Sequence, residues 1–175
     1  MKYLAISILL LLPLCGWAQN EERNDDDNSN PFTNEVGFNA GGTTGVGLSY
    51  RHWFNRIGLQ VTGMPLKIDN DIFISAGLTG LYSLHNTKYT RVYAYWGNQV
   101  FYLKKSYYDY IGDQPILNYG TNAFYCSGIG IGFSLGRVVA FNISVGYAAY
   151  QLIGAGYHNG LSLLPTGEIG LFWRF

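Results

Sequence analysis

The sequence predicts an all-β protein, an eight-stranded antiparallel up-and-down transmembrane β-barrel. Three observations predict this fold. Eight segments alternate apolar residues with small or polar ones, which is the pattern of strands with two unlike faces. The 175 residues include 23 glycines and 17% aromatic residues but only 13% charged residues, whereas globular domains average about 25% charged residues. Finally, tight connections alternate with longer ones, as they do when a membrane barrel has short turns at one end and loops at the other.

The composition excludes two broad classes of protein. The 15 Tyr, 10 Phe and 4 Trp residues supply more apolar surface than a disordered chain carries. Eleven basic residues balance eleven acidic ones, and a nucleic-acid-binding protein needs an excess of positive charge to meet phosphate. We therefore expect a folded protein that has no nucleic-acid partner.

Residues 1–18 have the pattern of a secretory signal peptide. Lys2 precedes an apolar run over residues 4–14, and Gly16 and Ala18 are the small residues of a cleavage site near Ala18-Gln19. The run is shorter than the roughly 20 apolar residues of a membrane-spanning helix. We therefore expect an exported protein.

A lipoprotein signal ending at Cys15 is the alternative, although Leu14 departs from the small residue expected before that cysteine. Cleavage after Ala18 would remove Cys15 and leave Cys126, so the mature chain could form no internal disulfide.

Two further segments follow the signal peptide. Residues 19–34 are polar and acidic with no periodicity, which is typical of a flexible tail. Residues 35–175 form the predicted barrel. Its strands are expected over residues 35–41, 45–53, 57–64, 72–84, 89–103, 125–135, 139–150 and 166–175, and its longer loops over residues 65–71, 104–122 and 154–165. The short connection Gly42-Thr43-Thr44 breaks the alternation of loop lengths.

The two faces of the predicted strands indicate which one meets lipid. One face is apolar, and the other is mainly Gly, Ser, Thr, Asn and Ala, with few of the Lys and Glu residues that a water-facing surface carries. Small residues suit the crowded interior of an eight-stranded barrel. We therefore expect the apolar face outside, in a bilayer, where a closed ring leaves no strand edge unpaired.

Aromatic residues gather near the strand ends, where Tyr and Trp favour the membrane interface. A set at the tight-turn ends and a set near the long-loop ends are predicted to form two belts. The first set is Trp53, Phe54, Tyr82, Tyr89, Trp173 and Phe175, and the second is Tyr102, Tyr107, Tyr125 and Tyr147.

The region from Glu35 to Phe175 resembles the small eight-stranded outer-membrane β-barrels of bacteria, of the OmpX-like or OmpA-barrel-like kind. The alternating final strand Glu168–Phe175, which ends on Phe, is similar to the signal read by the barrel-assembly machinery. The segment Tyr50–Phe54 before a tight turn also resembles the second strand of such proteins. The resemblance implies the outer membrane of a Gram-negative-type bacterium, with outer-membrane lipid and the assembly machinery as partners. It leaves the activity open, because the family includes adhesins, anchors, lipid-modifying enzymes and secretion accessories.

Four charged residues are predicted to meet inside the barrel. If the first hairpin is centred on Thr43, Glu35 lies opposite Arg51, and closure of the ring brings Arg174 beside Glu35. Arg91 is expected nearby. Because buried charges need partners, this cluster is interpreted as a structural plug. An ion-selective constriction is the alternative.

The sequence gives little support to an enzyme. His52, His85 and His158 have no obvious carboxylate partner and no metal-ligand spacing. We therefore expect no catalytic residues, no metal and no cofactor.

The predicted loop over residues 104–122 is rich in tyrosine and mixed charge, a composition that suits contacts with an extracellular protein or glycan. Tyr107, Tyr108, Tyr110 and Tyr119 are the predicted contact residues, with an extended aromatic belt as the alternative interpretation. The leading hypothesis is a non-enzymatic barrel with a structural or surface-interaction role. A transport or secretion accessory is the alternative, and a lipid-modifying barrel enzyme and a soluble lipocalin-like carrier follow.

Overall fold

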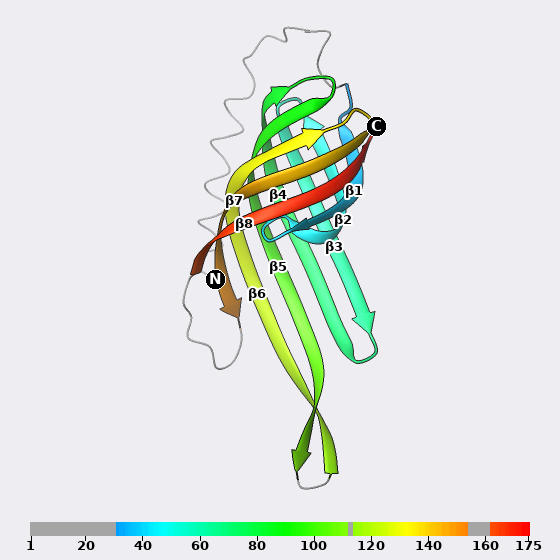
Figure 1. Ribbon diagram of the computed structural model, residues 1–175, viewed down its shortest axis with the longest axis vertical. Coiled ribbons are helices and arrows are strands. Elements are labelled where there is room, and N and C mark those ends of the chain that lie inside the picture. Colours follow the sequence, from blue (N-terminus) through cyan, green and yellow to red (C-terminus); the bar gives the residue numbers. More distant parts are fainter. Residues whose placement is uncertain (1–30, 112–113, 154–161) are drawn as a thin grey trace.

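Eight antiparallel strands form one closed ring in which each strand pairs with its neighbours in sequence and β8 pairs with β1 (Figure 1). The computed structural model describes residues 31–111, 114–153 and 162–175, so the predicted signal peptide and most of the predicted tail lie outside the described residues. The predicted fold class, an all-β eight-stranded up-and-down barrel, is confirmed. The strands are β1 (Asn34–Gly41), β2 (Gly45–Phe54), β3 (Ile57–Ile68), β4 (Asp71–Asn86), β5 (Thr90–Ile111), β6 (Gln114–Leu135), β7 (Val139–Ile153) and β8 (Ser162–Arg174).

Burial alternates along the strands with the period of two that the sequence predicts. In β8, for example, Thr166, Glu168, Gly170, Phe172 and Arg174 are buried while the residues between them are exposed. The buried set is mostly polar or small, and the large aliphatic side chains other than Leu81 point outward. The polar interior and the apolar outer wall therefore reverse the arrangement of a soluble barrel. No helix among the described residues is long and apolar enough to cross a membrane.

The first hairpin and the closing strand pair share one register. Glu35 pairs with Arg51 across the first hairpin and with Arg174 across the closure. The backbone groups of Asn34 and Phe175 also exchange hydrogen bonds of 3.1 and 2.9 Å. The pairing of β1 with β8 therefore continues to Phe175. The register also places Glu35, Arg51 and Arg174 at the same height in the barrel.

The longer loops predicted over residues 65–71 and 104–122 are wrong. Strand β3 continues to Ile68 and turns at Asp69-Asn70, and Asp69 has a positive φ of 51°, a conformation that Asp tolerates better than most residues. Strands β5 and β6 pair without interruption from Thr90↔Leu135 to Ile111↔Gln114. Their hairpin projects beyond the ring as a long arm, with the β3–β4 hairpin beside its base (Figure 1).

Pro65 explains part of this error, because proline inside a strand usually argues against a strand. It lies beyond Gly63, the last residue of β3 that pairs with β2. At that point the described part of the sheet pairs β3 only with β4, so the strand tolerates a residue that has no backbone N–H.

A polar contact fastens the two projecting hairpins to each other. Asp71, which begins β4, accepts hydrogen bonds of 2.8 and 2.9 Å from the backbone N–H and the hydroxyl of Ser106 in β5. The last backbone pair between these strands is Ile72↔Lys104. The carboxylate of Asp71 therefore extends the contact between β4 and β5 beyond their last backbone pair.

These contacts predict the titration of Asp71. The Ser106 backbone N–H, and then its hydroxyl, hold the pKa of the Asp71 carboxyl below its ordinary value of 3.8. Because the folded-state pKa is the lower one, the contact contributes stability above the unfolded-state pKa and loses it as the pH falls through the folded-state pKa. In a ¹³C NMR titration, we expect the carboxyl resonance to have its midpoint below 3.8, and the substitution Ser106→Ala to move it upward. A midpoint at or above 3.8 in the unsubstituted protein would contradict the contact.

Candidate functional site

The interior of the tight-turn end is occupied by one carboxylate and three guanidinium groups. Glu35 is fully buried, and its Oε2 lies 2.9 Å from Arg51 Nη1. Its Oε1 lies 3.1 Å from Arg91 Nη1 and 3.0 Å from Arg174 Nε. The structure therefore brings together all four residues that the sequence predicts for the interior cluster, from strands β1, β2, β5 and β8.

Neutral groups bind the guanidinium N–H groups that Glu35 does not reach. Arg51 donates to Gln60 Oε1 from Nε at 3.0 Å and from Nη2 at 2.7 Å. Arg174 donates to the Ser134 hydroxyl and to the carbonyl of Gly136 in a tight turn. The cluster is thus tied to β3, β6 and the β6–β7 turn, which makes it a cross-link through the lumen.

Aromatic rings pack against the cluster from inside the barrel. Arg91 lies 4.2 Å from the centroid of the Trp53 ring, and Arg51 lies 4.4 Å from that of Phe172. The Trp53 indole N–H also donates to Glu35 Oε1 at 3.3 Å. The face of an aromatic ring is negative and attracts a cation, so the two ring contacts stabilise the buried guanidinium groups.

The position of Trp53 corrects one sequence prediction. Trp53 is 2% exposed and lies in the lumen, so it takes no part in an outer aromatic belt. The signal was present in the sequence, because Trp53 lies two residues after Arg51 and therefore on the same face of β2. The other five residues predicted at this end are exposed on the outside: Phe54, Tyr82, Tyr89, Trp173 and Phe175.

A second polar layer lies at the opposite end of the lumen and is built by the β1–β2 turn. Thr43 and Thr44 are buried inside the barrel, and both hydroxyls donate to the Glu168 carboxylate, Thr44 at 2.8 Å. The Ser144 hydroxyl donates to the same carboxylate at 3.1 Å. The turn that breaks the alternation of loop lengths is therefore folded into the barrel and fills it.

Glycines on the facing strands make room for this turn. A Cβ atom at Gly97 would lie 2.9 Å from the carbonyl carbon of Thr43, and one at Gly128 would lie 2.6 Å from Thr43 Cγ2. A Cβ atom at Gly77 would collide with the carbonyl of Thr44. The inward glycines of β4, β5 and β6 thus have a specific packing role that periodicity alone cannot reveal.

Glu168 is expected to be the main anchor of the turn. The substitution Glu168→Ala should lower the free energy of unfolding by about 2–3 kcal/mol, because it leaves three buried hydroxyls without their acceptor. Urea titration of the protein in phospholipid vesicles measures this change. Glu168→Gln, which keeps one acceptor oxygen, should cost less. Equal stability of Glu168→Ala and the unsubstituted protein would show that the turn is held by other contacts.

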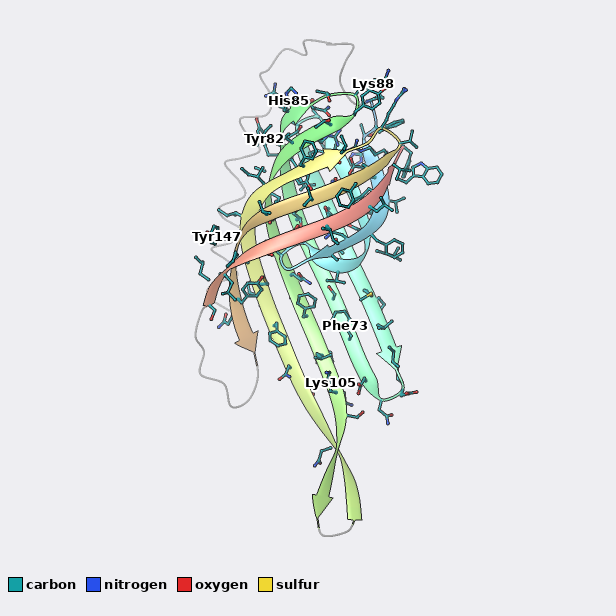
Figure 2. All side chains as sticks on the ribbon, viewed as in Figure 1. Phe73, Tyr82, His85, Lys88, Lys105 and Tyr147 are labelled. Carbon is teal, nitrogen blue, oxygen red and sulfur yellow. The ribbon has the colours of Figure 1, made fainter. Side chains whose placement is uncertain are left out.

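The histidines do not converge on a site. The His52 ring nitrogen Nδ1 lies 2.7 Å from Asn34 Oδ1 on the outer wall, and His85 is exposed near the β4–β5 turn (Figure 2). His158 lies outside the described residues. In the described part of the chain, no group of three or more His, Cys, Asp or Glu side chains could hold a metal ion. Cys126 is buried in the lumen as a free thiol.

The predicted contact tyrosines belong to the projecting hairpin. The backbones of Tyr107, Tyr108 and Tyr110 lie in β5, and that of Tyr119 lies in β6 opposite Ser106. Their side chains lie outside the described residues. These four positions are therefore strand positions of the arm, whereas the sequence predicts a loop.

The ring, its two polar layers and its outer wall define a class of protein: a closed eight-stranded antiparallel barrel with a filled interior. A scan against models of protein families finds no match, and a search of curated proteins finds no similar sequence. Among solved structures, the chain is similar to the N-terminal β-barrel domain of OprF from Pseudomonas aeruginosa, with 12% identity, a TM-score of 0.45, and coverage of 85% of this chain and 99% of that domain. It is also similar to CarO from Acinetobacter baumannii, with 11% identity, a TM-score of 0.38, and coverage of 82% and 98%. The class assignment rests on the closed strand register of this chain itself.

Proposed function

We propose that the chain is a non-enzymatic, integral outer-membrane β-barrel protein with a structural or surface-interaction role. The apolar outer wall carries this proposal. Phe38, Ile129 and Val145 are 65–66% exposed, and outward aliphatic residues continue around the ring. Soluble monomers rarely expose contiguous apolar surface of this kind, whereas a bilayer solvates it.

The dimensions of the wall fit a bilayer. The outward row of β7 runs from Val139 to Tyr147 without a charged residue. Nine residues at about 3.4 Å each, tilted by about 40°, cover roughly 20–25 Å of height. The apolar band of outer-membrane barrels is about 25 Å tall. The exported leader that the sequence predicts agrees with this destination.

The filled interior supports a role other than conduction. The Glu35 cluster occupies one end of the lumen, and the Thr43–Thr44 turn with Glu168 occupies the other. Eight strands enclose a space that side chains fill. We assign the extracellular role to the projecting hairpins, whose partner would be a protein or glycan. The exposed final strand, which ends at Phe175, would be recognised by the barrel-assembly machinery.

Two measurements test this proposal. After cell fractionation, we expect the protein in the outer-membrane fraction, soluble only in detergent, and after insertion into planar bilayers we expect no large, stable conductance. Recovery in the soluble periplasm without detergent would contradict the membrane assignment. A stable conductance of the pure protein would contradict the filled lumen and favour the ion-selective constriction.

A further inference from the structure

The three turns at the tight-turn end of the barrel carry one basic residue each. Arg56 lies in the β2–β3 turn, Lys88 in the β4–β5 turn and Arg137 in the β6–β7 turn. Arg56 and Arg137 are exposed, and Lys88 is half-buried with its Nζ 5.8 Å from the centroid of the Tyr89 ring. Figure 2 shows Lys88 at the end of the barrel opposite Lys105. The name basic rim is used below for Arg56, Lys88 and Arg137.

Positive charge also exceeds negative charge in the lumen next to this rim. The buried cluster contains three guanidinium groups but a single carboxylate, that of Glu35. In the described part of the chain, Glu35 is the only acidic side chain at the tight-turn end. The other acidic residues that the structure describes lie toward the opposite end and are Asp69, Asp71, Asp109 and Glu168. The tight-turn end therefore attracts anionic groups.

The chain carries a concentrated negative charge shortly before β1. Residues 21–27 include five of the eleven acidic residues of the whole sequence and one basic residue, Arg23. The acidic residues are Glu21, Glu22, Asp25, Asp26 and Asp27. The name acidic segment is used below for residues 21–27, which lie outside the described residues. Its charge is opposite to that of the basic rim and of the cluster behind it.

The start of β1 places the attachment point of the acidic segment beside the basic rim. The backbone N–H of Trp53 donates to the carbonyl of Thr33 at 2.8 Å, and Arg56 follows Trp53 by three residues. Asp27 precedes Thr33 by six residues, which span up to about 20 Å. Neighbouring turns of the rim are two strand spacings apart, or about 10 Å. The acidic segment can therefore reach the rim without any movement of the barrel.

We propose that the acidic segment binds the basic rim of the same chain and covers the tight-turn end of the lumen. A single exposed ion pair is weak, but a tether of a few residues gives its two partners an effective concentration in the millimolar range. Lipid phosphates are the alternative occupant of the rim. They surround the wall, however, whereas the surplus charge of the buried cluster lies inside it. The inference goes beyond the proposed function, because the contact forms within one chain and needs no lipid or outside partner.

Carbodiimide cross-linking tests this contact, because the reagent joins a carboxylate to an amine that it touches. The mature chain, residues 19–175, is treated in phosphatidylcholine nanodiscs, and the cross-linked peptides are mapped by mass spectrometry. We expect Lys88 to be joined to carboxylates of the acidic segment. Arg56→Lys and Arg137→Lys keep the positive charge and should each add a cross-link to the same segment. The yield should fall at least fivefold in about 1 M NaCl, where the Debye length is about 3 Å.

Charge reversal distinguishes binding from chance encounter of a tethered segment. The double substitution Arg56→Glu with Arg137→Glu leaves Lys88 and the tether in place, and should reduce the Lys88 cross-link at least fivefold. The matched control reverses two lysines at the opposite end, Lys67→Glu with Lys105→Glu, and should leave the yield unchanged. All four substituted residues are exposed, so we expect each variant to fold.

Several outcomes would overturn the proposal. They are the absence of the Lys88 cross-link, an equal yield after reversal of Arg56 and Arg137 or in high salt, and comparable cross-linking of the acidic segment to Lys105. Loss of the cross-link when phosphatidylglycerol replaces part of the phosphatidylcholine would identify lipid phosphates as the occupant. Cross-links only between ¹⁴N- and ¹⁵N-labelled copies would identify a second chain. If the protein fails to enter nanodiscs, the membrane assignment is wrong, and the same cross-link in aqueous buffer still tests the contact.

Discussion

Replacing Glu35 by Gln is expected to lower the free energy of unfolding by about 3–5 kcal/mol, which is typical when one partner of a buried ion pair is removed. The substitution leaves Arg51, Arg91 and Arg174 inside the barrel without their shared counter-charge, since Glu35 forms an ion pair with each of them. Urea titration in phospholipid vesicles, followed by tryptophan fluorescence, measures the change. Trp53 reports on it directly because its ring contacts the cluster.

The matched control makes the same carboxylate-to-amide change on an exposed turn. Asp69→Asn should alter the free energy of unfolding by no more than about 0.5 kcal/mol, since Asp69 is exposed and Asn tolerates its positive φ of 51°. A loss below 1 kcal/mol for Glu35→Gln would show that the three arginines are solvated in the lumen and that the cluster is no structural plug.

Placing a charge on the outer wall is expected to have a comparably large effect. Ile143 stands midway along the outward row of β7 and is 47% exposed. If the wall faces lipid, Ile143→Arg should cost about 2–4 kcal/mol, the range for a cation at the bilayer midplane. On a water-facing surface the same change would cost no more than about 0.5 kcal/mol. The free energy of unfolding in phosphatidylcholine vesicles distinguishes these values.

The control for this substitution is the same change at a position near the membrane interface. Val138, in the β6–β7 turn, is also exposed on the outside, at 44%. Val138→Arg should cost about 0–1 kcal/mol, because the turn lies near the membrane interface. Equal costs at the two positions would mean that depth has no influence and that Ile143 does not face the bilayer core.

Much of the fold follows from the sequence because a strand has a period of two. Alternation assigns the inward and outward residues of each strand, and centring the first hairpin on Thr43 gives the pairing of Glu35 with Arg51. The position of Arg174 then follows from closure alone, since the last strand of a barrel must pair with the first. The charged cluster can therefore be predicted from the positions of its residues in the sequence.

Other parts of the interior cannot be predicted from the sequence pattern in this way. The inward fold of the Thr43–Thr44 turn depends on the conformation of a three-residue connection and on facing glycines from distant strands. Glu168 can be placed on the inward face from the sequence, but its partners cannot. The projecting hairpins are missed for a different reason, because Pro65 and the polar residues of the arm have the composition of loops.

A nitroxide scan along β7 tests the central claim, an apolar wall in lipid around a filled polar lumen, most directly. Single cysteines at positions 141–145, in a Cys126→Ser background, are spin-labelled in phospholipid vesicles, and their accessibility to oxygen and to a water-soluble nickel complex is measured. We expect oxygen accessibility to peak at Phe141, Ile143 and Val145 and to fall at Asn142 and Ser144, with little nickel accessibility at any of them. High nickel accessibility at Phe141, Ile143 and Val145 would place the wall in water and contradict the membrane assignment.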